Sequence, residues 1–264
     1  MNYARWIAHF IANKLDRPEP DWSAPFSMPE DKRRLLAKSI AEYQLGDGGG
    51  ECRLVARDAE SFRGSAEEAR VVVDCWFAEE REHSRLLARA VERIGGEFIT
   101  DTFAFRMFYA CRRALGVQFE MLVLLIVEIV STGYYRVIRR HVGDKPLADM
   151  CKLILRDEAR HIDFHRDRLA ALHPCGFGAG RALMFRLLAD CCAAFLWHGH
   201  GRCLRALGGT RGELFRHVRG GVAGFLSELA AVTFPGTSRL PIKIDSNRKH
   251  SALVFEKWKQ LLPR

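Results

Sequence analysis

The sequence predicts an all-α fold, an up-down bundle of four long helices with additional N- and C-terminal helices. Apolar residues recur with helical periodicity over long segments, and no stretch shows the alternation of a convincing strand. Short turns separate the long segments, which makes successive helices antiparallel neighbours. The 264 residues, 48% of them apolar, suffice for one large domain. We therefore expect a single domain over 1–264, with a core bundle at about 30–172 and a helical extension at about 176–264.

Local signals place the helix boundaries. The Pro-Glu-Pro stretch at 18–20 requires a loop after the first helix. Ser65, followed by Glu68, forms a capping box that opens one helix, and the glycine pair 95–96 ends it. The expected helices span about 4–15, 29–62 with an interruption at 46–50, 65–94, 102–114, 117–141, 146–172, 177–207, 211–233 and 251–262.

The net charge of +9 lies in the last third of the chain. Residues 1–175 contain 27 Lys or Arg and 27 Asp or Glu, whereas residues 176–264 contain 14 and 5. A basic surface could meet nucleic acid, anionic lipid or an acidic protein, or simply keep the protein soluble. No aromatic-interleaved basic motif accompanies the charge, so nucleic acid is not an expected partner. The longest uninterrupted apolar run is far shorter than the ~20 residues that a membrane span needs, so none is expected.

The eight cysteines form no CxxC pair. The first apolar stretch, residues 6–11, is short and interrupted by His9, unlike a signal peptide. We therefore expect reduced thiols in a cytoplasmic protein. The stretch 191–203 contains three cysteines and two histidines, but their spacing matches no zinc pattern. Helix packing is therefore favoured for these cysteines over a second metal site.

Two Glu-x-x-His pairs, Glu80 with His83 and Glu158 with His161, carry the first indication of chemistry. Positions i and i+3 of a helix lie on one face about one turn apart, so both side chains could bind one metal ion. A single pair would be a weak indication, because solvated Glu and His are common on helices. Two pairs on separate long helices predict a metal site.

Glu128 is the only polar side chain in the run 121–130. A helix that is apolar all round is buried. An unpaired carboxylate there would cost on the order of several kcal/mol. A metal ion would supply the missing partner, and protonation with a raised pKa is the alternative.

A fourth carboxylate is expected on the remaining long helix, where Glu42, Asp47 and Glu51 are candidates. Glu128 precedes the glutamate of the next Glu-x-x-His pair by 30 residues. Glu51 precedes the other such glutamate by 29, Asp47 by 33 and Glu42 by 38. A bundle of two helix hairpins favours matching intervals, so Glu51 is the expected ligand. Asp47 is the runner-up, because the glycines at 48–50 obscure the spacing.

The expected set has one carboxylate from each of two helices and a Glu-x-x-His from each of the other two. Its members are Glu51, Glu80, His83, Glu128, Glu158 and His161. This is the di-iron carboxylate arrangement of helical bundles. Oxygen ligands with one imidazole per metal suit iron or manganese better than zinc. We expect two iron ions, with manganese or a mixed manganese–iron pair as the alternative.

The segments around these pairs resemble the ferritin-like di-iron carboxylate superfamily. The stretch 78–87 resembles the first Glu-x-x-His helix of the soluble acyl-carrier-protein desaturases, and 156–161 resembles the second. Residues 40–172 more closely resemble bacterial ferritin-like proteins of unassigned function. Those proteins carry a Gln-x-Gly-Glu segment, as at 44–47 with Asp in last place, and a Val-Glu step followed by Tyr-Tyr, as in 127–135.

This resemblance implies a ferritin-like fold and a site that activates dioxygen. Asp157 would orient a ligand histidine. The implied activity is a di-iron oxidoreductase that hydroxylates, desaturates or N-oxygenates a small-molecule or acyl substrate. The alternative is a ferroxidase or peroxide-reducing protein of ferritin or rubrerythrin type, and a third possibility is a scaffold with a structural site. An oxygenase would need an external electron donor such as a ferredoxin, which the basic third could dock. A homodimer is compatible with this resemblance.

Two further side chains are candidate catalytic residues. Tyr135 lies seven residues after Glu128, on the same helix face, and could donate a hydrogen bond or an electron near the metals. The alternative is a core position with the hydroxyl at a wet edge. His165 follows His161 by four residues on one face and could be a further ligand or a proton relay, as in di-iron N-oxygenases with an additional histidine. Its alternative is simple exposure to solvent.

Overall fold

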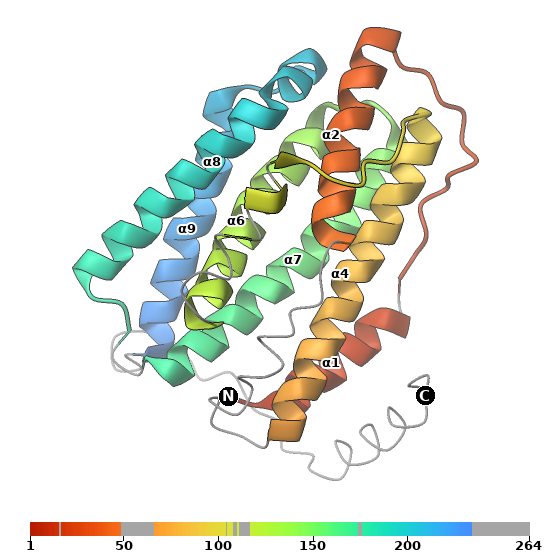
Figure 1. Cartoon of the computed structure of the whole chain (residues 1–264). Coiled ribbons are helices and arrows are strands. Elements are labelled where there is room, and N and C mark those ends of the chain that lie inside the picture. The colour runs from red at the N-terminus through yellow and green to blue at the C-terminus, as the bar shows by residue number, and fades with distance from the viewer. Residues whose placement is uncertain are drawn as a thin grey trace.

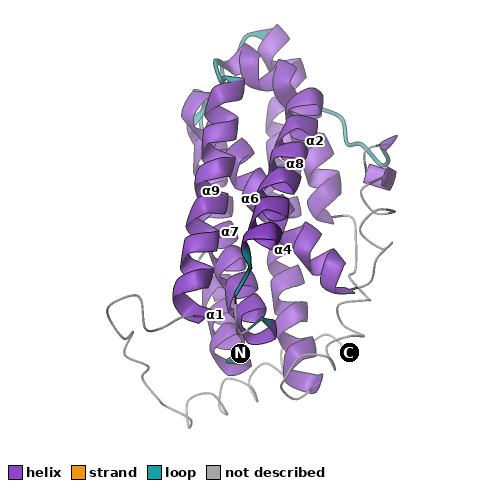
Figure 2. Ribbon diagram, turned by 90° about the vertical axis from the view of Figure 1, so that its left-hand side faces the viewer, coloured by secondary structure: helices purple, strands orange, loops and turns teal. Residues whose placement is uncertain are grey.

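A computed structural model describes residues 1–15, 17–48, 66–103, 105–107, 110, 117–173 and 176–233. Within these residues every regular element is a helix, so the all-α prediction is confirmed. The helices are α1 (Tyr3–Leu15), α2 (Glu30–Gly48), α4 (Ala66–Ile94), α6 (Val117–His141), α7 (Lys145–Leu172), α8 (Ala179–Leu207) and α9 (Arg211–Thr233). Figures 1 and 2 show the six longer helices running side by side as a bundle. The helices predicted for 49–62 and 251–262, and the cap at Ser65, lie outside the described residues.

The helix ends follow the predicted turn chemistry. Gly95 adopts a left-handed φ of 71°, and the N–H of Gly96 donates to the carbonyl of Val91 at 2.9 Å. This Schellman motif satisfies a carbonyl that the end of α4 would otherwise leave unpaired. Asp144 caps the start of α7, because its carboxylate accepts the N–H of Leu147 at 3.0 Å.

The packing places α6 in the middle of the bundle. It contacts α7, α8 and α9, while α2 contacts α4 and α8, and α7 also contacts α4 and α9. A main apolar core joins all of these helices except α1. Helix α1 packs across α4 at one end of the bundle (Figure 1). A second apolar cluster holds it there, with Trp6, Phe10, Trp76, Met121 and Phe164 among its buried members.

One described segment, Phe119–His141, is long and apolar enough to cross a membrane by length and composition. Most of it is buried inside the bundle, and the core helix of a soluble protein passes the same test. The same helix carries Glu128, whose surroundings are given below. The segment is therefore a weak indication of a membrane span.

Candidate metal centre

Four of the predicted ligands converge where α4, α6 and α7 meet. Glu80, Glu128, Glu158 and His161 each offer a ligand atom, and these atoms lie within 4.8 Å of one another. The Nδ1 atom of His161 is 2.9 Å from Glu80 Oε1 and 3.4 Å from Glu158 Oε2. It is 3.8 Å from Glu128 Oε1. Residues from three helices therefore surround one imidazole nitrogen.

A second group lies beside the first. Asp47, Glu80 and His83 also bring ligand atoms within 4.8 Å of one another. The Nδ1 atom of His83 lies 3.8 Å from Glu80 Oε2 and 3.6 Å from Glu158 Oε1. Glu80 and Glu158 thus lie between the two imidazoles, and each imidazole has one further carboxylate of its own. We call these six residues, Asp47, Glu80, His83, Glu128, Glu158 and His161, the carboxylate–histidine cluster.

The three candidates for the first-helix ligand have different positions. Glu51, the expected ligand, lies outside the described residues. Asp47, the runner-up, lies in the last turn of α2 within the second group. Glu42 is placed next to His200 instead, with Oε2 3.7 Å from Nε2 of that imidazole. Among the described residues of α2, the structure therefore brings Asp47 to the cluster.

Each histidine of the cluster makes a second contact on its outer side. His161 Nε2 lies 3.0 Å from Glu79 Oε2, and His83 Nε2 lies 3.2 Å from Asp157 Oδ2. The pairing is crossed, because each carboxylate directly precedes the glutamate of the opposite Glu-x-x-His pair. Carboxylates in this position fix the tautomer and orientation of a ligand imidazole. Sequence reasoning assigned Asp157 this role and missed Glu79, although an acidic residue precedes the glutamate in both pairs.

Helix α1 joins the two outer carboxylates, Glu79 and Asp157. The amide of Asn13 donates to Glu79 and also to Asp157, in the second case at 2.8 Å. The guanidinium of Arg17 lies 2.7 Å from Asp157. No sequence pattern predicts the role of Asn13 in α1 or of Arg17 just after α1, because neither belongs to a repeat of the Glu-x-x-His motif.

The carboxylates of the cluster have pKa values pushed in opposite directions. Burial, reinforced by Glu80, raises the pKa of Asp47 to about 8. Burial and the neighbouring Glu128 hold the pKa of Glu158 well above its usual range. For Glu80, burial acts to raise the pKa, but His161 and the other adjacent imidazole outweigh it and hold the pKa below its usual range. Without a cation the cluster is therefore short of positive charge.

The two imidazoles respond to the same surroundings. Burial acts to lower the pKa of each, but neighbouring carboxylates outweigh it. For His83 the hydrogen bond with Asp157 is the largest opposing cause, and for His161 it is the charge of Glu80. Both pKa values lie well above the ordinary histidine range. The site therefore attracts cations, either protons or metal ions.

Three of the donor atoms that a metal ion would use lie near oppositely charged groups but make no hydrogen bond with a described residue. Nδ1 of His83, Nδ1 of His161 and Oε2 of Glu158 are buried, and none makes a hydrogen bond with a described residue. Buried polar atoms are rarely left in this state without a ligand or water. The four carboxylates of the cluster also carry the formal charge that two divalent cations would neutralise. The donor set therefore fits a pair of metal ions.

Tyr135 and His165 are both fully buried. The Tyr135 hydroxyl donates to Asp47 Oδ2 at 3.3 Å, so it contacts the cluster and not a wet edge. His165 packs edge-on against Trp76, with ring centroids 4.9 Å apart, and neither ring nitrogen has a hydrogen-bond partner among the described residues. The exposed alternative for His165 is therefore wrong. Burial lowers its pKa well below the usual range, and it belongs to neither group of potential ligands.

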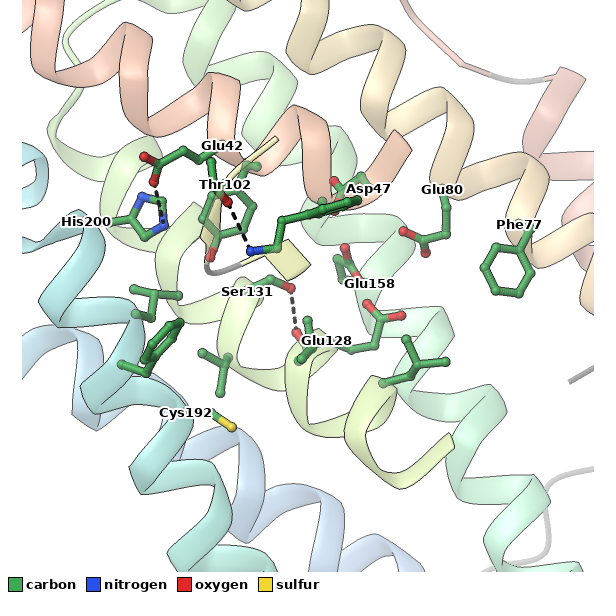
Figure 3. A pocket seen from close by; sticks show the side chains of 18 of the residues that line it. Glu42, Asp47, Phe77, Glu80, Thr102, Glu128, Ser131, Glu158, Cys192 and His200 are labelled. Atoms are coloured by element: carbon green, nitrogen blue, oxygen red, sulfur yellow. Dashed lines mark hydrogen bonds and ion pairs between the residues drawn. The ribbon is translucent and has the colours of Figure 1, made fainter. Parts of the chain in front are cut away.

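A cavity of about 270 Å³ adjoins the cluster (Figure 3). Asp47, Glu80, Glu128 and Glu158 reach its wall. Side chains of α2, α4, α6 and α8, together with Thr102 and Phe105, form the rest. The α8 contribution comes from the extension after residue 175: Cys192, Phe195, Leu196 and His200. The apolar members from the other helices include Trp76, Phe77, Leu124, Val127 and Val130.

The described cysteines are free thiols. Cys75, Cys151 and Cys203 are buried, Cys192 is partly buried and Cys191 is exposed. Cys52, Cys111 and Cys175 lie outside the described residues. None of the described cysteines belongs to a group of described side chains that could hold a metal ion. The burial of Cys203 suits a packing role, whereas the exposed Cys191 does not pack in the core.

Comparison of the chain with protein-family models, curated proteins and solved structures finds no match. What can be inferred about its function therefore comes from the residues and their geometry.

Proposed function

We propose that this protein is a ferritin-like oxidoreductase that holds two iron ions in the carboxylate–histidine cluster and uses dioxygen to oxidise a small organic substrate. The observation that carries this proposal is the set of buried donor atoms that make no hydrogen bond with the described residues. The Nδ1 atoms of His83 and His161 face the four carboxylates of the cluster. The Nε2 atom of each imidazole contacts an outer carboxylate. Helical bundles that place one carboxylate on each of two helices and a Glu-x-x-His on each of two others are di-iron or di-manganese proteins.

The residues of the chain have distinct roles in this proposal. Glu80 and Glu158 would be shared between the two metal positions, while Asp47 and Glu128 would each serve one. A reduced iron pair would supply dioxygen binding and reduction. The Tyr135 hydroxyl holds a proton next to Asp47, and burial together with that carboxylate raises its pKa, so it stays protonated.

The apolar pocket favours oxidation of an organic substrate over a ferroxidase activity. A ferroxidase delivers iron to its site as a hydrated ion, for which a polar entry suits best. Here the cavity wall beside the cluster contains Trp76, Leu124, Val127 and Phe195. Apolar cavities with a few convergent polar groups are typical of small-molecule sites.

The proposed reaction requires an external reductant. Insertion of one atom of dioxygen into a substrate leaves the other to be reduced to water, which consumes two electrons and two protons. A ferredoxin-like donor suits the excess of basic residues after position 175 by charge. The five described free thiols suit a reducing compartment such as the cytoplasm.

Metal analysis tests this function most directly. Protein from iron-supplemented cells should contain about two irons per chain, as di-iron bundles do. Glu128→Ala and His161→Ala should both lose iron. The iron(II)-loaded protein should also consume dioxygen.

Two exposed positions provide matched controls. Glu92→Ala on α4 and His198→Ala on α8 remove the same functional groups from the surface and should leave the iron content unchanged. Glu128→Gln keeps the shape of the buried side chain, so it separates a lost ligand from a misfolded core. A metal-free protein whose stability is unaffected by these substitutions would disprove the proposal.

A further inference from the structure

The cavity has a second polar end, away from the carboxylate–histidine cluster. Figure 3 shows Glu42 and His200 on one side of the cavity, while Glu80, Glu128 and Glu158 lie on the other. We call Glu42 and His200 the distal pair. Apolar side chains line the wall between the two ends, among them Val130 and Leu196. Nothing in the proposed metal chemistry uses the distal pair.

A chain of hydrogen bonds fixes the imidazole of the distal pair. His200 Nδ1 lies 2.8 Å from Ser39 Oγ, and Ser39 Oγ lies 2.7 Å from the hydroxyl of Tyr134. The Tyr43 ring packs against both ends of this chain, stacked on Tyr134 with centroids 4.0 Å apart and 5.2 Å from His200. Nδ1 is therefore engaged by the protein, and Nε2 is the nitrogen left for the cavity. Burial lowers the pKa of His200 to about 4, so this imidazole is neutral at pH 7.

Among the described residues, the carboxylate of the distal pair has no close charged partner. Its two contacts with charged or titratable groups are at 3.7 Å, from Oε2 to His200 Nε2, and at 4.0 Å, from Oε1 to Lys38 Nζ. Both are longer than a hydrogen bond. The Lys38 side chain is 73% exposed, whereas that of Glu42 is 26% exposed. A carboxylate at a cavity wall without a hydrogen-bonded partner favours a ligand that donates hydrogen bonds and carries positive charge.

The charges of the two cavity ends support the same ligand class. Two divalent cations would offset the four carboxylates of the cluster. Glu42 then carries the remaining negative charge on the cavity wall, since His200 is neutral. An anionic ligand head would meet repulsion there, and a cationic head would meet attraction.

We propose that the distal pair is a recognition subsite for the ammonium group of a small amine. Binding of the ammonium group there directs the rest of the amine toward the carboxylate–histidine cluster. The ammonium group donates to Glu42, and the apolar body packs against the wall contributed by α6 and α8. This inference rests on the proposed function for its oxidation step, but the recognition step stands independently. The cavity of about 270 Å³ suits a compact amine and is small for a long acyl chain.

Calorimetric titration of the full chain with matched ligands tests the subsite. The probes are 2-phenylethylammonium, 2-phenylethanol and 3-phenylpropanoate, with a parallel n-hexyl series of amine, alcohol and carboxylate. The amines should bind most tightly, and the carboxylates most weakly. Glu42→Gln should weaken amine binding by about tenfold and leave alcohol binding unchanged. Glu42→Lys should reverse the preference toward the carboxylates.

Glu30→Gln is the matched control, because Glu30 lies on the same helix outside the cavity. It should alter none of these affinities. Equal binding of amine and alcohol by the wild-type chain, no binding of either series, or an unchanged preference in Glu42→Gln would overturn the subsite.

The iron content and dioxygen consumption of the same preparations separate the two proposals. A protein that holds iron and consumes dioxygen without amine preference contradicts the subsite alone. Amine preference in a protein that binds no iron contradicts the function and leaves the subsite standing.

Discussion

The two ends of the cavity use buried imidazoles in opposite ways. At the metal end, surrounding carboxylates raise the pKa of His83 and His161 well above the ordinary value. At the distal end, burial and the charge of Lys38 lower the pKa of His200 to about 4. All three side chains are largely removed from solvent. Burial alone therefore does not decide the charge of a histidine. The number of carboxylates around the imidazole, and the hydrogen bonds that they make with it, also matter.

The carboxylate–histidine cluster is therefore suited to attract cations, whereas the distal pair is suited to recognise a ligand. The metal end concentrates negative charge around two imidazole nitrogens that lack hydrogen bonds. The distal end has one carboxylate beside an imidazole whose Nδ1 is engaged by Ser39. Substitutions at the two ends of the cavity should therefore change different measured properties of the protein.

The largest effect is expected at a shared carboxylate. Glu158 lies 3.6 Å from one cluster imidazole and 3.4 Å from the other, so Glu158→Ala should remove both metal ions together. Metal analysis and thermal unfolding would measure the result. Asp47→Ala should affect mainly the ion next to His83. Retention of a full metal complement by Glu158→Ala would contradict the shared position.

The next effect concerns the outer carboxylates. Glu79→Gln and Asp157→Asn keep the side-chain shape but weaken the contact with His161 and His83, respectively. Each should lower metal affinity by about 10–100-fold, as losses of such partners do. Competition with a chelator would measure the affinities. Because the contacts are crossed, Asp157→Asn should disturb the ion next to His83, although Asp157 directly precedes Glu158 in the chain.

The last effect concerns acid stability at the distal end. His200 has a folded pKa of about 4, below the ordinary value of 6.5. The unfolded chain therefore binds more protons between these values, and stability falls as pH drops from 6.5 to 4. His200→Gln removes this contribution, so its free energy of unfolding should fall less over that window, by about 3 kcal/mol.

His198→Gln is the matched control, because His198 is exposed on the same helix. Denaturant titrations at pH 7 and pH 4 should show wild-type acid sensitivity for this control. Equal acid sensitivity of the two variants would show that His200 is not held neutral by the fold.

The grouping of Glu80, Glu128, Glu158 and His161 could be predicted from the sequence, because these residues follow a periodic pattern. The Glu-x-x-His spacing places Glu80 and His83 on one helix face, and the apolar run around Glu128 implies burial. Helix periodicity is local, so it can be read from neighbouring positions. The crossed contacts of Glu79 and Asp157 could not be read in the same way, since they depend on how α4 and α7 face each other.

The distal pair and the contacts of α1 could not be predicted from local sequence patterns. Local sequence patterns mark His200 only as one of several zinc-type side chains in the stretch 191–203, and Glu42 only as a candidate metal ligand. Their pairing follows from the contact of α2 with α8. Asn13 likewise reaches Glu79 and Asp157 only because α1 packs across α4. Contacts between helices far apart in sequence carry no periodic pattern.

Two groups of helices form the cavity wall. The carboxylate–histidine cluster lies on α2, α4, α6 and α7, whereas Cys192, Phe195, Leu196 and His200 come from α8. No residue of the cluster lies on α8. Substitutions on that helix can therefore accumulate without changing any residue of the carboxylate–histidine cluster, so the range of ligands that the cavity accepts can diverge while the cluster is inherited intact.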